Sequence, residues 1–352
     1  MKIAIISVTN QGDYIAEKIN EKISCTIFNR NMVKERGIKN IVGNIFDKFD
    51  AIIFMSSTGI AVRSIAMHVK SKATDPAVLV IDASSKYVIS LLSGHIGGAN
   101  ELTSEISDII QAQPIITTAT DALGVVAPDV IARDHKLIIE SMKDCKDIAA
   151  LIVEGKKILF IDEDEIIEVP KGYVSISEME NINKDITMKD EHYKSLLEVV
   201  QGVVIVTNKS EVSKCNKIDL GSIPTLKLIR KNIILGIGCR KDYDSITMSE
   251  NVRNVLKENN LHKDSVMEIS TVEIKSREKA ILDLVGEYKC EFKIHTIEEI
   301  SKVEELFEGS DFVKKTIGVK AVSDPCVHLS GGEIFQYKTK LNGMTLTIGR
   351  KN

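Results

Sequence analysis

No stretch of the sequence reaches the roughly 18 consecutive apolar residues that a membrane-spanning helix requires. The opening residues, MKIAIISVTN, contain an apolar run that is too short for a secretory signal peptide. We therefore expect a soluble cytoplasmic protein that binds no membrane.

Charges of one sign are not clustered either. The chain has 46 lysines and arginines and 50 aspartates and glutamates, which give a formal net charge of -4. It has no long block of like charges, and this balance predicts no nucleic-acid partner. A small polyanionic ligand remains compatible with it, because a few local cations and backbone N–H groups are enough to bind one.

Paired cysteines and nucleotide-binding motifs are also missing. Without a Cys-x-x-Cys pair or histidines at zinc-finger spacing, we expect reduced thiols and no protein-bound metal. The first strand-like run is followed by SVTNQGDY, which lacks Gly-x-Gly-x-x-Gly, and Gly-x-x-x-x-Gly-Lys-Ser/Thr occurs nowhere, so a nucleotide-binding protein is disfavoured. The cysteines are Cys25, Cys145, Cys215, Cys239, Cys290 and Cys326.

The sequence does contain an alternation of strand-like and helix-like segments. Short apolar runs rich in β-branched residues predict buried strands at 2–8, 51–56, 77–83, 87–93 and 114–118. Between them, apolar residues at helical spacing predict two buried helix faces. These faces consist of Val62, Ile65, Ala66 and Val69, and of Leu102, Ile106, Ile109 and Ile110. We predict an N-terminal α/β domain at 1–130 with a mostly parallel open sheet.

The rest of the chain predicts two further parts. Residues 131–228 should form a smaller, divergent α+β module, with strands at 157–161, 173–177 and 203–207, a charged stretch at 183–194 and a polar linker at 213–224. Residues 229–352 should form a C-terminal α/β three-layer domain. It should open with a strand that runs into a Gly-x-Gly turn, continue with a helix from Ser245, and close with a hairpin around Asn342-Gly343.

Three strand-to-helix turns of the N-terminal domain carry small and polar residues. These are Ser57, Thr58, Gly59 and Arg63 in the first turn, Gly94, Gly97, Gly98 and Asn100 in the second, and Thr117, Thr118 and Asp121 in the third. Because the carboxyl ends of parallel strands share one edge of a sheet, we expect the turns to line a single crevice. Each turn also has an ordinary explanation, since hydroxyls cap helices and glycines permit tight turns and close packing.

His95 lies in the second of these turns, between Gly94 and Ile96, and not on an apolar helix face. This position favours an acid–base or hydrogen-bonding role over a packed core histidine, although a solvated loop histidine fits equally well. The N–H groups of Gly97 and Gly98 could face an anion at the start of a helix, or these glycines could simply form a tight turn.

The C-terminal part offers three further candidates. Cys239, after Gly238, could be a nucleophile at a helix N-terminus, although a small buried thiol is the commoner outcome. Lys275 and Glu278 have the spacing of neighbours on a helix, where a solvated ion pair would explain them. The segment SDPCVHLSGGE (323–333) contains an acid, a histidine and a Gly-Gly pair, which alone would suggest a helix with its terminating glycines.

Taken together and in order, STGIAVR, LSGHIGGAN, PIITTATDALG, GIGCR, STVEIKS and DPCVHLSGG resemble the cobalt-precorrin-5A hydrolase family of anaerobic cobalamin biosynthesis. The resemblance covers the N- and C-terminal parts, and the middle module is placed mainly by its position. In one departure, Asp324 stands where a glutamate of a Glu-Pro-Ala-Ala type segment is expected. This shorter acid weakens the case for a catalytic carboxylate at that position.

The resemblance implies a hydrolase that acts on a carbon–carbon bond. It would open the δ-lactone between the ring A acetate and C20 of cobalt-precorrin-5A and release acetaldehyde, giving cobalt-precorrin-5B. The cobalt would arrive with the substrate, so the protein would hold no cofactor. For this chemistry we expect His95, Asp121 and Thr118 to be catalytic. The expected substrate-binding residues are Ser57, Thr58, Gly59, Arg63, Gly94, Gly97, Gly98, Asn100, Thr117, Gly238, Cys239 and Lys275.

A non-catalytic corrinoid-binding or carrier protein of the same pathway is the alternative. It is suggested by the C-terminal part, which resembles a small stand-alone protein of the aerobic cobalamin pathway. The expected partner is the small-molecule substrate. A homodimer and transient contacts with neighbouring pathway enzymes are compatible with the resemblance.

Overall fold

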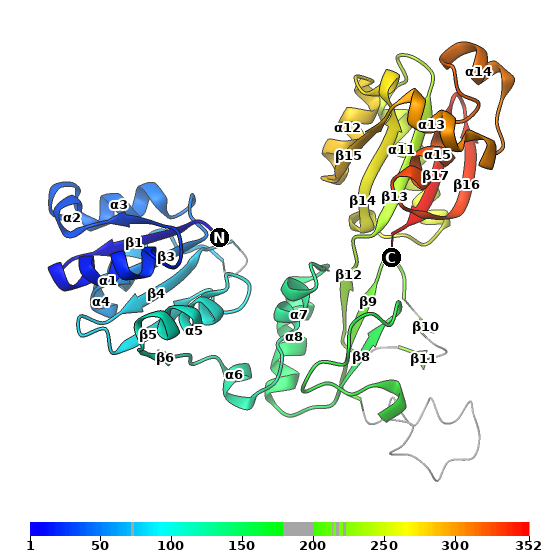
Figure 1. The fold of residues 1–352 in the computed structure, drawn as a ribbon. Coiled ribbons are helices and arrows are strands. Elements are labelled where there is room, and N and C mark those ends of the chain that lie inside the picture. The colour runs from blue at the N-terminus through cyan, green and yellow to red at the C-terminus, as the bar shows by residue number, and fades with distance from the viewer. Residues whose placement is uncertain (72–73, 179–199, 213, 216–217, 221–222, 352) are drawn as a thin grey trace, which may run out of the picture. The chain divides into compact units, whose positions relative to one another are not determined.

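The computed structural model describes residues 1–71, 74–178, 200–212, 214–215, 218–220 and 223–351 (Figure 1). The chain divides into two compact units. The first consists of Met1–Arg133 with Ile152–Gly155 and Pro170–Gly172, and the second contains the other residues from Asp134 onward. The expected boundaries at residues 130 and 228 stay predictions. Within the described ranges, no helix is long and apolar enough to cross a membrane.

The first unit is built on a six-stranded sheet in the order β2-β1-β3-β4-β5-β6. Its strands are β1 (Ile3–Ser7), β2 (Cys25–Phe28), β3 (Ala51–Met55), β4 (Ala77–Ile81), β5 (Tyr87–Leu92) and β6 (Gln113–Ile115). All neighbouring strands are parallel except β4 and β5, which are antiparallel. The mostly parallel open sheet is therefore confirmed, and β2 is an edge strand that the sequence pattern did not reveal.

Helices cover both faces of this sheet, which explains why β1, β3 and β4 are buried along their whole length (Figure 1). Helices α1 (Asn10–Asn20) and α5 (Ala99–Ile110) pack on one face. On the other face lie α2 (Arg30–Arg36), α3 (Ile38–Ile45) and α4 (Thr58–Ile65). Two short helices, α6 (Ala119–Leu123) and α7 (Pro128–Asp134), complete the described helices of this unit.

The two predicted helix faces have different outcomes. On α5, Leu102, Ile106 and Ile110 are buried as expected. On α4, Ala61, Ser64 and Ile65 are buried, whereas Val62 is 45% exposed. The prediction for α4 is wrong because the helix ends at Ile65, so Val69 lies outside it. A long apolar stripe was inferred from a segment that forms only a short helix.

Because β4 and β5 are antiparallel, the candidate turns lie at opposite ends of the strands of the sheet. Leu92 at the end of β5 pairs with Val78 at the start of β4, whereas Met55 at the end of β3 pairs with Ile81 at the end of β4. Strand β6 runs parallel to β5. The turns after β5 and β6 therefore lie at one end of the strands, and the turn after β3 lies at the opposite end. The expectation of a single crevice lined by all three turns is wrong.

The second unit begins with a four-stranded sheet in the order β7-β12-β9-β8. Its elements are β7 (Ile138–Ile139), α8 (Met142–Val153), β8 (Ile158–Asp162), β9 (Gly202–Thr207) and β12 (Thr225–Ile229). The strands predicted at 157–161 and 203–207 are confirmed. The strand predicted at 173–177 is wrong, since Val174 forms only an isolated bridge to Leu159. The charged stretch at 183–194 lies outside the described residues.

Part of the predicted linker at 213–224 forms secondary structure. Strands β10 (Lys214–Cys215) and β11 (Ile218–Asp219) pair antiparallel. Strand β12 follows and pairs with β9 and β7. Its Leu226, Leu228 and Ile229 side chains are buried. The polar segment therefore contains a short antiparallel pair of strands and precedes a sheet strand.

A five-stranded sheet in the order β15-β14-β13-β17-β16 forms the rest of the second unit. Its strands are β13 (Ile233–Cys239), β14 (Val266–Val272), β15 (Glu291–His295), β16 (Glu333–Leu341) and β17 (Met344–Arg350). Helices α11 (Ser245–Glu258) and α12 (Lys279–Tyr288) pack on one face. On the other face lie α13 (Ile297–Val303) and α15 (Ser323–Leu329), and α14 (Asp311–Ile317) lies between them in the chain. The predicted three-layer α/β arrangement is confirmed.

The ends of this sheet test two turn predictions. The hairpin at Asn342-Gly343 is confirmed, with both residues at positive φ. The Gly-x-Gly turn at 236–238 is wrong, because both glycines lie inside β13. A Cβ on Gly236 would lie 2.1 Å from the carbonyl oxygen of Ser323 on α15, so this glycine allows a helix to pack directly on the strand.

Candidate acid–base site

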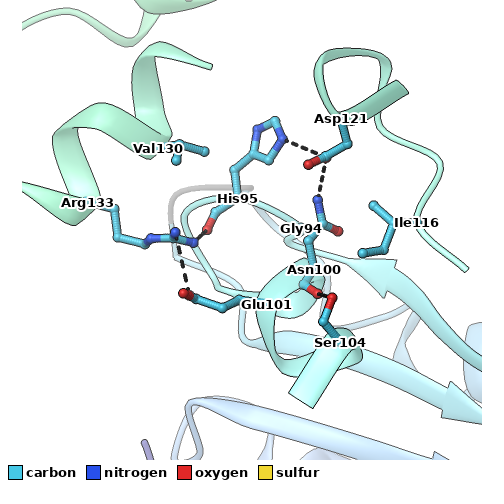
Figure 2. A pocket seen from close by; sticks show the side chains of 9 residues that line it. All are labelled: Gly94, His95, Asn100, Glu101, Ser104, Ile116, Asp121, Val130 and Arg133. Carbon is cyan, nitrogen blue, oxygen red and sulfur yellow. Dashed lines mark hydrogen bonds and ion pairs between the residues drawn. The ribbon is translucent and has the colours of Figure 1, made fainter. Parts of the chain in front are cut away.

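Segments that follow β5 and β6 meet at one edge of the first unit's sheet and form a pocket of about 220 Å³ (Figure 2). The turn after β5 contributes Gly94 and His95, and the first turn of α5 contributes Asn100 and Glu101. Ile116 and Asp121 come from the segment that follows β6. Helix α7 supplies Val130 and Arg133, and Ser104 completes the lining. Two of the three candidate turns therefore form a common site, together with a helix that the sequence analysis did not select.

The glycines of this turn are required mainly by packing. A Cβ on Gly97 would lie 2.5 Å from Cβ of Ser93, and one on Gly94 would lie 2.7 Å from Oδ1 of Asn100. Gly98 adopts a left-handed φ of 79°. Its N–H donates to the carbonyl oxygen of His95 at 2.9 Å, so the prediction that this N–H is free for an anion is wrong. The tight-turn interpretation therefore explains Gly98, and the anion-binding role of the Gly97 N–H stays a prediction.

Asn100 connects three segments of the site. Its amide Nδ2 donates to Oδ2 of Asp121 at 2.8 Å and to Oγ1 of Thr118 at 3.1 Å, while its Oδ1 accepts from Ser90 of β5 at 2.7 Å. The Thr118 hydroxyl also donates to Oδ2 of Asp121. The side chain of Asp121 is thereby fixed toward the pocket, as Figure 2 shows. Thr117, next to Thr118, is exposed.

His95 is surrounded by two carboxylates. Its Nε2 lies 3.5 Å from Oδ2 of Asp121 and 3.2 Å from the hydroxyl of Thr120. On the other side of the ring, Nδ1 lies 3.3 Å from Oδ1 of Asp129, whose side chain is buried. The hydrogen bond that His95 donates to the Asp129 carboxylate raises the pKa of His95, and the charges of both aspartates add to this effect against the opposing effect of burial. An imidazole can both accept and donate a proton, and the two carboxylates favour its protonated form.

Arg133 supplies positive charge at the pocket wall. Its Nη1 donates to the carbonyl oxygen of His95 at 2.8 Å, and its Nη2 lies 3.5 Å from Oε2 of Glu101 (Figure 2). The guanidinium group is therefore held against the turn that carries His95. An arginine in such a position can bind a carboxylate group of a ligand.

Sequence reasoning missed both Asp129 and Arg133. They lie in APDVIARD, where a proline at the first helical position and an acid in the first turn are typical of any helix start. Nothing in the local pattern distinguishes Asp129 from an ordinary acid near a helix N-terminus. Thr120 belongs to the Thr-rich turn at 116–124, but its contact with His95 depends on the parallel pairing of β5 and β6.

The turn after β3 stands apart from this pocket. Ser57 precedes α4 as its N-cap residue without a side-chain capping bond. Thr58 and Gly59 begin the helix, and the guanidinium of Arg63 folds back over this first turn, with Nη1 3.3 Å from where a Cβ on Gly59 would lie. Arg63 therefore lies at the opposite edge of the sheet from His95. The expected roles of these residues in substrate binding stay predictions.

The candidates in the second unit are packed against protein groups. Gly238 is a strand residue on which a Cβ would lie 2.8 Å from Oγ1 of Thr345. Burial raises the pKa of the Cys239 thiol to about 11, which disfavours the nucleophilic thiolate. The ammonium of Lys275 lies 3.1 Å from Oε2 of Glu278, and these side chains are only 13% and 9% exposed. The ion pair is therefore mostly buried, and it joins a 3₁₀ turn to the residue before α12 instead of lying along one helix.

Asp324 is buried on the first turn of α15. Its Oδ1 accepts from the Thr347 hydroxyl at 2.5 Å and from the Lys338 N–H at 2.9 Å. These bonds attach α15 to β17 and β16, which is a structural role for this carboxylate.

Two further observations concern metals and thiols. Across the described part of the chain, no group of three or more His, Cys, Asp or Glu side chains is arranged to hold a metal ion. The cysteines whose side chains the structure describes are free thiols.

The open α/β sheet, with a histidine held between two carboxylates beyond the ends of its strands, identifies an α/β protein with a pocket suited to acid–base chemistry. Three family models match along the chain. They are Cobalamin synthesis G N-terminal at 40–121, Cobalamin biosynthesis central region at 126–215 and Cobalamin synthesis G C-terminus at 233–349. The chain belongs to this cobalamin synthesis G family.

Two relatives and one solved structure are similar to this chain along nearly its whole length. The chain is 28% identical to a cobalt-precorrin-5A hydrolase of Salmonella typhimurium, over 99% of this chain and 97% of the relative. It is 27% identical to a cobalt-precorrin-5A hydrolase of Priestia megaterium, over 98% of this chain and 94% of the relative. A crystal structure of a cobalamin biosynthesis protein G homologue from Sulfolobus solfataricus aligns with 21% identity and a TM-score of 0.41, covering 100% of this chain and 97% of that one.

Proposed function

We propose that this protein is a cobalt-precorrin-5A hydrolase. It opens the δ-lactone between the ring A acetate and C20 of cobalt-precorrin-5A, consumes one water and releases acetaldehyde to give cobalt-precorrin-5B. The proposal rests on one observation above all. In this chain, which is similar along nearly its whole length to relatives named for this reaction, His95 lies in an open pocket between Asp121 and Asp129.

The size of the pocket supports entry of only one edge of the substrate. Pockets that enclose a drug-sized ligand usually measure about 300–1,000 Å³, and this one measures about 220 Å³. A tetrapyrrole macrocycle therefore cannot enter it, whereas a lactone ring at the periphery of the macrocycle can. The carboxylate of Asp121 favours a neutral group next to Nε2 of His95, so a carboxylate of the substrate belongs on the Arg133 side of the pocket.

His95 is the group that transfers protons. In its neutral form it accepts a proton from the water that attacks the lactone carbonyl, and in its protonated form it returns one to the departing oxygen. The neighbouring aspartates raise its pKa, which favours the protonated form that returns a proton. Release of acetaldehyde then requires removal of the hydroxyl proton from the two-carbon fragment, which leaves the bonding electron pair on the macrocycle. The same imidazole is suited to take that proton.

Asp121 and Thr118 orient and stabilise this histidine. The carboxylate of Asp121 faces Nε2 and favours the protonated ring, and the Asn100 amide and Thr118 hydroxyl hold that carboxylate in place. Arg133, on the wall of the same pocket, binds a carboxylate of the substrate beside the lactone. This role was expected for Arg63, which lies at the other edge of the sheet.

The proposal also covers the cofactor, the location and the partners of the enzyme. Cobalt enters and leaves within the substrate, and the protein holds no cofactor of its own. The enzyme acts in the cytoplasm on a small-molecule substrate. Contacts with neighbouring pathway enzymes and a homodimer stay predictions.

The direct test is anaerobic incubation of the purified protein with cobalt-precorrin-5A, with acetaldehyde and the corrinoid mass both followed. We expect stoichiometric acetaldehyde and a corrinoid mass that has gained one water and lost one acetaldehyde. Binding of the corrinoid with unchanged mass and no acetaldehyde would instead establish the carrier alternative.

A further inference from the structure

We propose that Asp129 is the positioning residue that fixes the ring orientation and the tautomer of His95. This inference rests on the proposed function for its catalytic consequence, but its structural part concerns the free protein. The sequence resemblance assigns no role to Asp129, and its place at the start of α7 does not reveal one.

The geometry that carries the inference is the position of the carboxylate behind the ring. Asp129 is 3% exposed, and its Oδ1 lies 3.3 Å from Nδ1 of His95, on the opposite side of the imidazole from Asp121. His95 is 18% exposed and opens onto the pocket. A buried carboxylate that faces the inner nitrogen, with the outer nitrogen turned toward substrate, is the arrangement that orients catalytic histidines.

This placement decides which nitrogen of His95 carries the proton. An ionised carboxylate can only accept hydrogen bonds, so either aspartate favours a proton on the nitrogen that faces it. Asp129 lies nearer its nitrogen, at 3.3 Å against 3.5 Å for Asp121, and Oδ2 of Asp121 already accepts from Asn100 and Thr118, so the neutral ring keeps its proton on Nδ1. In the neutral ring Nε2 is then an acceptor, and it faces Thr120 and the Asp121 side of the pocket. Free histidine favours the opposite tautomer, with the proton on Nε2. Asp129 therefore prepares Nε2 to act as a base before substrate binds.

The other charged groups around His95 cannot perform this task. Asp121, on α6, approaches Nε2 and not Nδ1. Arg133, on α7, contacts the backbone carbonyl of His95, and Glu101, on α5, contacts Arg133. Asp129 is also the largest cause of the raised pKa of His95, so it affects both the tautomer and the proportion of protonated ring.

The first test requires no substrate and no change to the Asp129 side chain. Protein labelled with ¹⁵N-histidine is titrated by NMR, and the His95 signals are assigned by their absence in His95→Gln. We expect the neutral form of His95 to carry its proton on Nδ1. A neutral His95 that carries its proton on Nε2 would overturn the inference.

The second test uses Asp129→Asn, with Asp108→Asn on the exposed surface of α5 as the matched control. We expect Asp129→Asn to lower the pKa of His95 in the NMR titration and to reduce kcat/KM at pH 7 on the order of 100-fold. The inflection of its pH profile should move to lower pH, while Asp108→Asn leaves both readouts unchanged. An unchanged His95 pKa in folded Asp129→Asn would contradict the inference.

The outcomes separate this inference from the proposed function. If His95 shows the Nδ1–H tautomer but wild-type protein releases no acetaldehyde, the positioning role stands and the hydrolase proposal fails. If wild type releases acetaldehyde while the tautomer is Nε2–H, the hydrolase proposal stands and Asp129 is not the positioning residue. Should Asp129→Asn fail to fold, the wild-type tautomer still decides the question.

Discussion

The carboxyl ends of β5 and β6 in the first unit and of β13 and β14 in the second unit both carry ionisable residues, but these residues have different chemical properties. In the first unit, His95 and Asp121 face a pocket, and the pKa of the histidine is raised by neighbouring carboxylates. In the second, Cys239 is a half-buried thiol whose pKa is raised by burial, and Lys275 is paired with Glu278. Ionisable groups that remain titratable and accessible suit proton transfer, whereas groups that are buried and paired suit stability.

Motif residues that look equally important in the sequence therefore serve different purposes in the structure. Under the proposed function, proton transfer belongs to the first unit, whereas Cys239, Lys275 and Asp324 in the second unit are half-buried or paired with protein groups. The following substitutions test this division.

The largest expected effect on stability is in the second unit. Lys275→Met removes one partner of a mostly buried ion pair and leaves the Glu278 carboxylate without its counter-charge. We expect the free energy of unfolding to fall by about 3 kcal/mol in chemical denaturation. The control is Lys279→Met, because Lys279 pairs with Asp283 at side-chain exposures of 85% and 49% and should change stability by less than about 0.5 kcal/mol. A loss of substrate affinity without a loss of stability would contradict a structural role for Lys275.

Asp121→Asn should affect chemistry more than folding. The change removes the charge that faces Nε2 of His95 but keeps the size of the side chain. We expect kcat/KM for acetaldehyde release to fall by about 10- to 100-fold with little change in thermal stability. Asp108→Asn again serves as the control. Wild-type kinetics in Asp121→Asn would remove this carboxylate from the site.

Cys239→Ser should have the smallest effect. Its thiol is protonated near neutral pH, because burial raises its pKa to about 11, and so it offers no thiolate for catalysis. We expect kcat/KM to stay within about twofold of wild type, as it should for Cys290→Ser, another half-buried thiol with a pKa of about 11. A drop of two orders of magnitude in Cys239→Ser alone would place chemistry in the second unit.

Sequence patterns predicted most of the fold because most elements have strong local signals. The buried β-branched runs of β1, β3 and β4 and the stripe of α5 are of this kind. Strand β2 and the short α4 lack such signals. The Gly-x-Gly of β13 was misread because close packing of a helix on a strand needs glycine as much as a turn does.

The candidate site was predicted only in part, for a topological reason. The turns that contain His95 and Asp121 were found, and the structure brings them together. Their separation from Arg63 follows from the antiparallel pairing of β4 with β5, which sequence periodicity does not report. Asp129 was missed because an acid at a helix start is common, and its contact with His95 exists only in the folded unit.

The central claim is that His95 transfers the protons of the reaction. The measurement that tests it most directly is anaerobic acetaldehyde release by His95→Gln, beside wild type and Cys239→Ser, across a range of pH. Glutamine keeps hydrogen-bonding capacity but cannot titrate, so we predict a loss of about 10²- to 10⁴-fold and no inflection from a histidine in the remaining activity. Turnover by folded His95→Gln within about threefold of wild type would contradict the account.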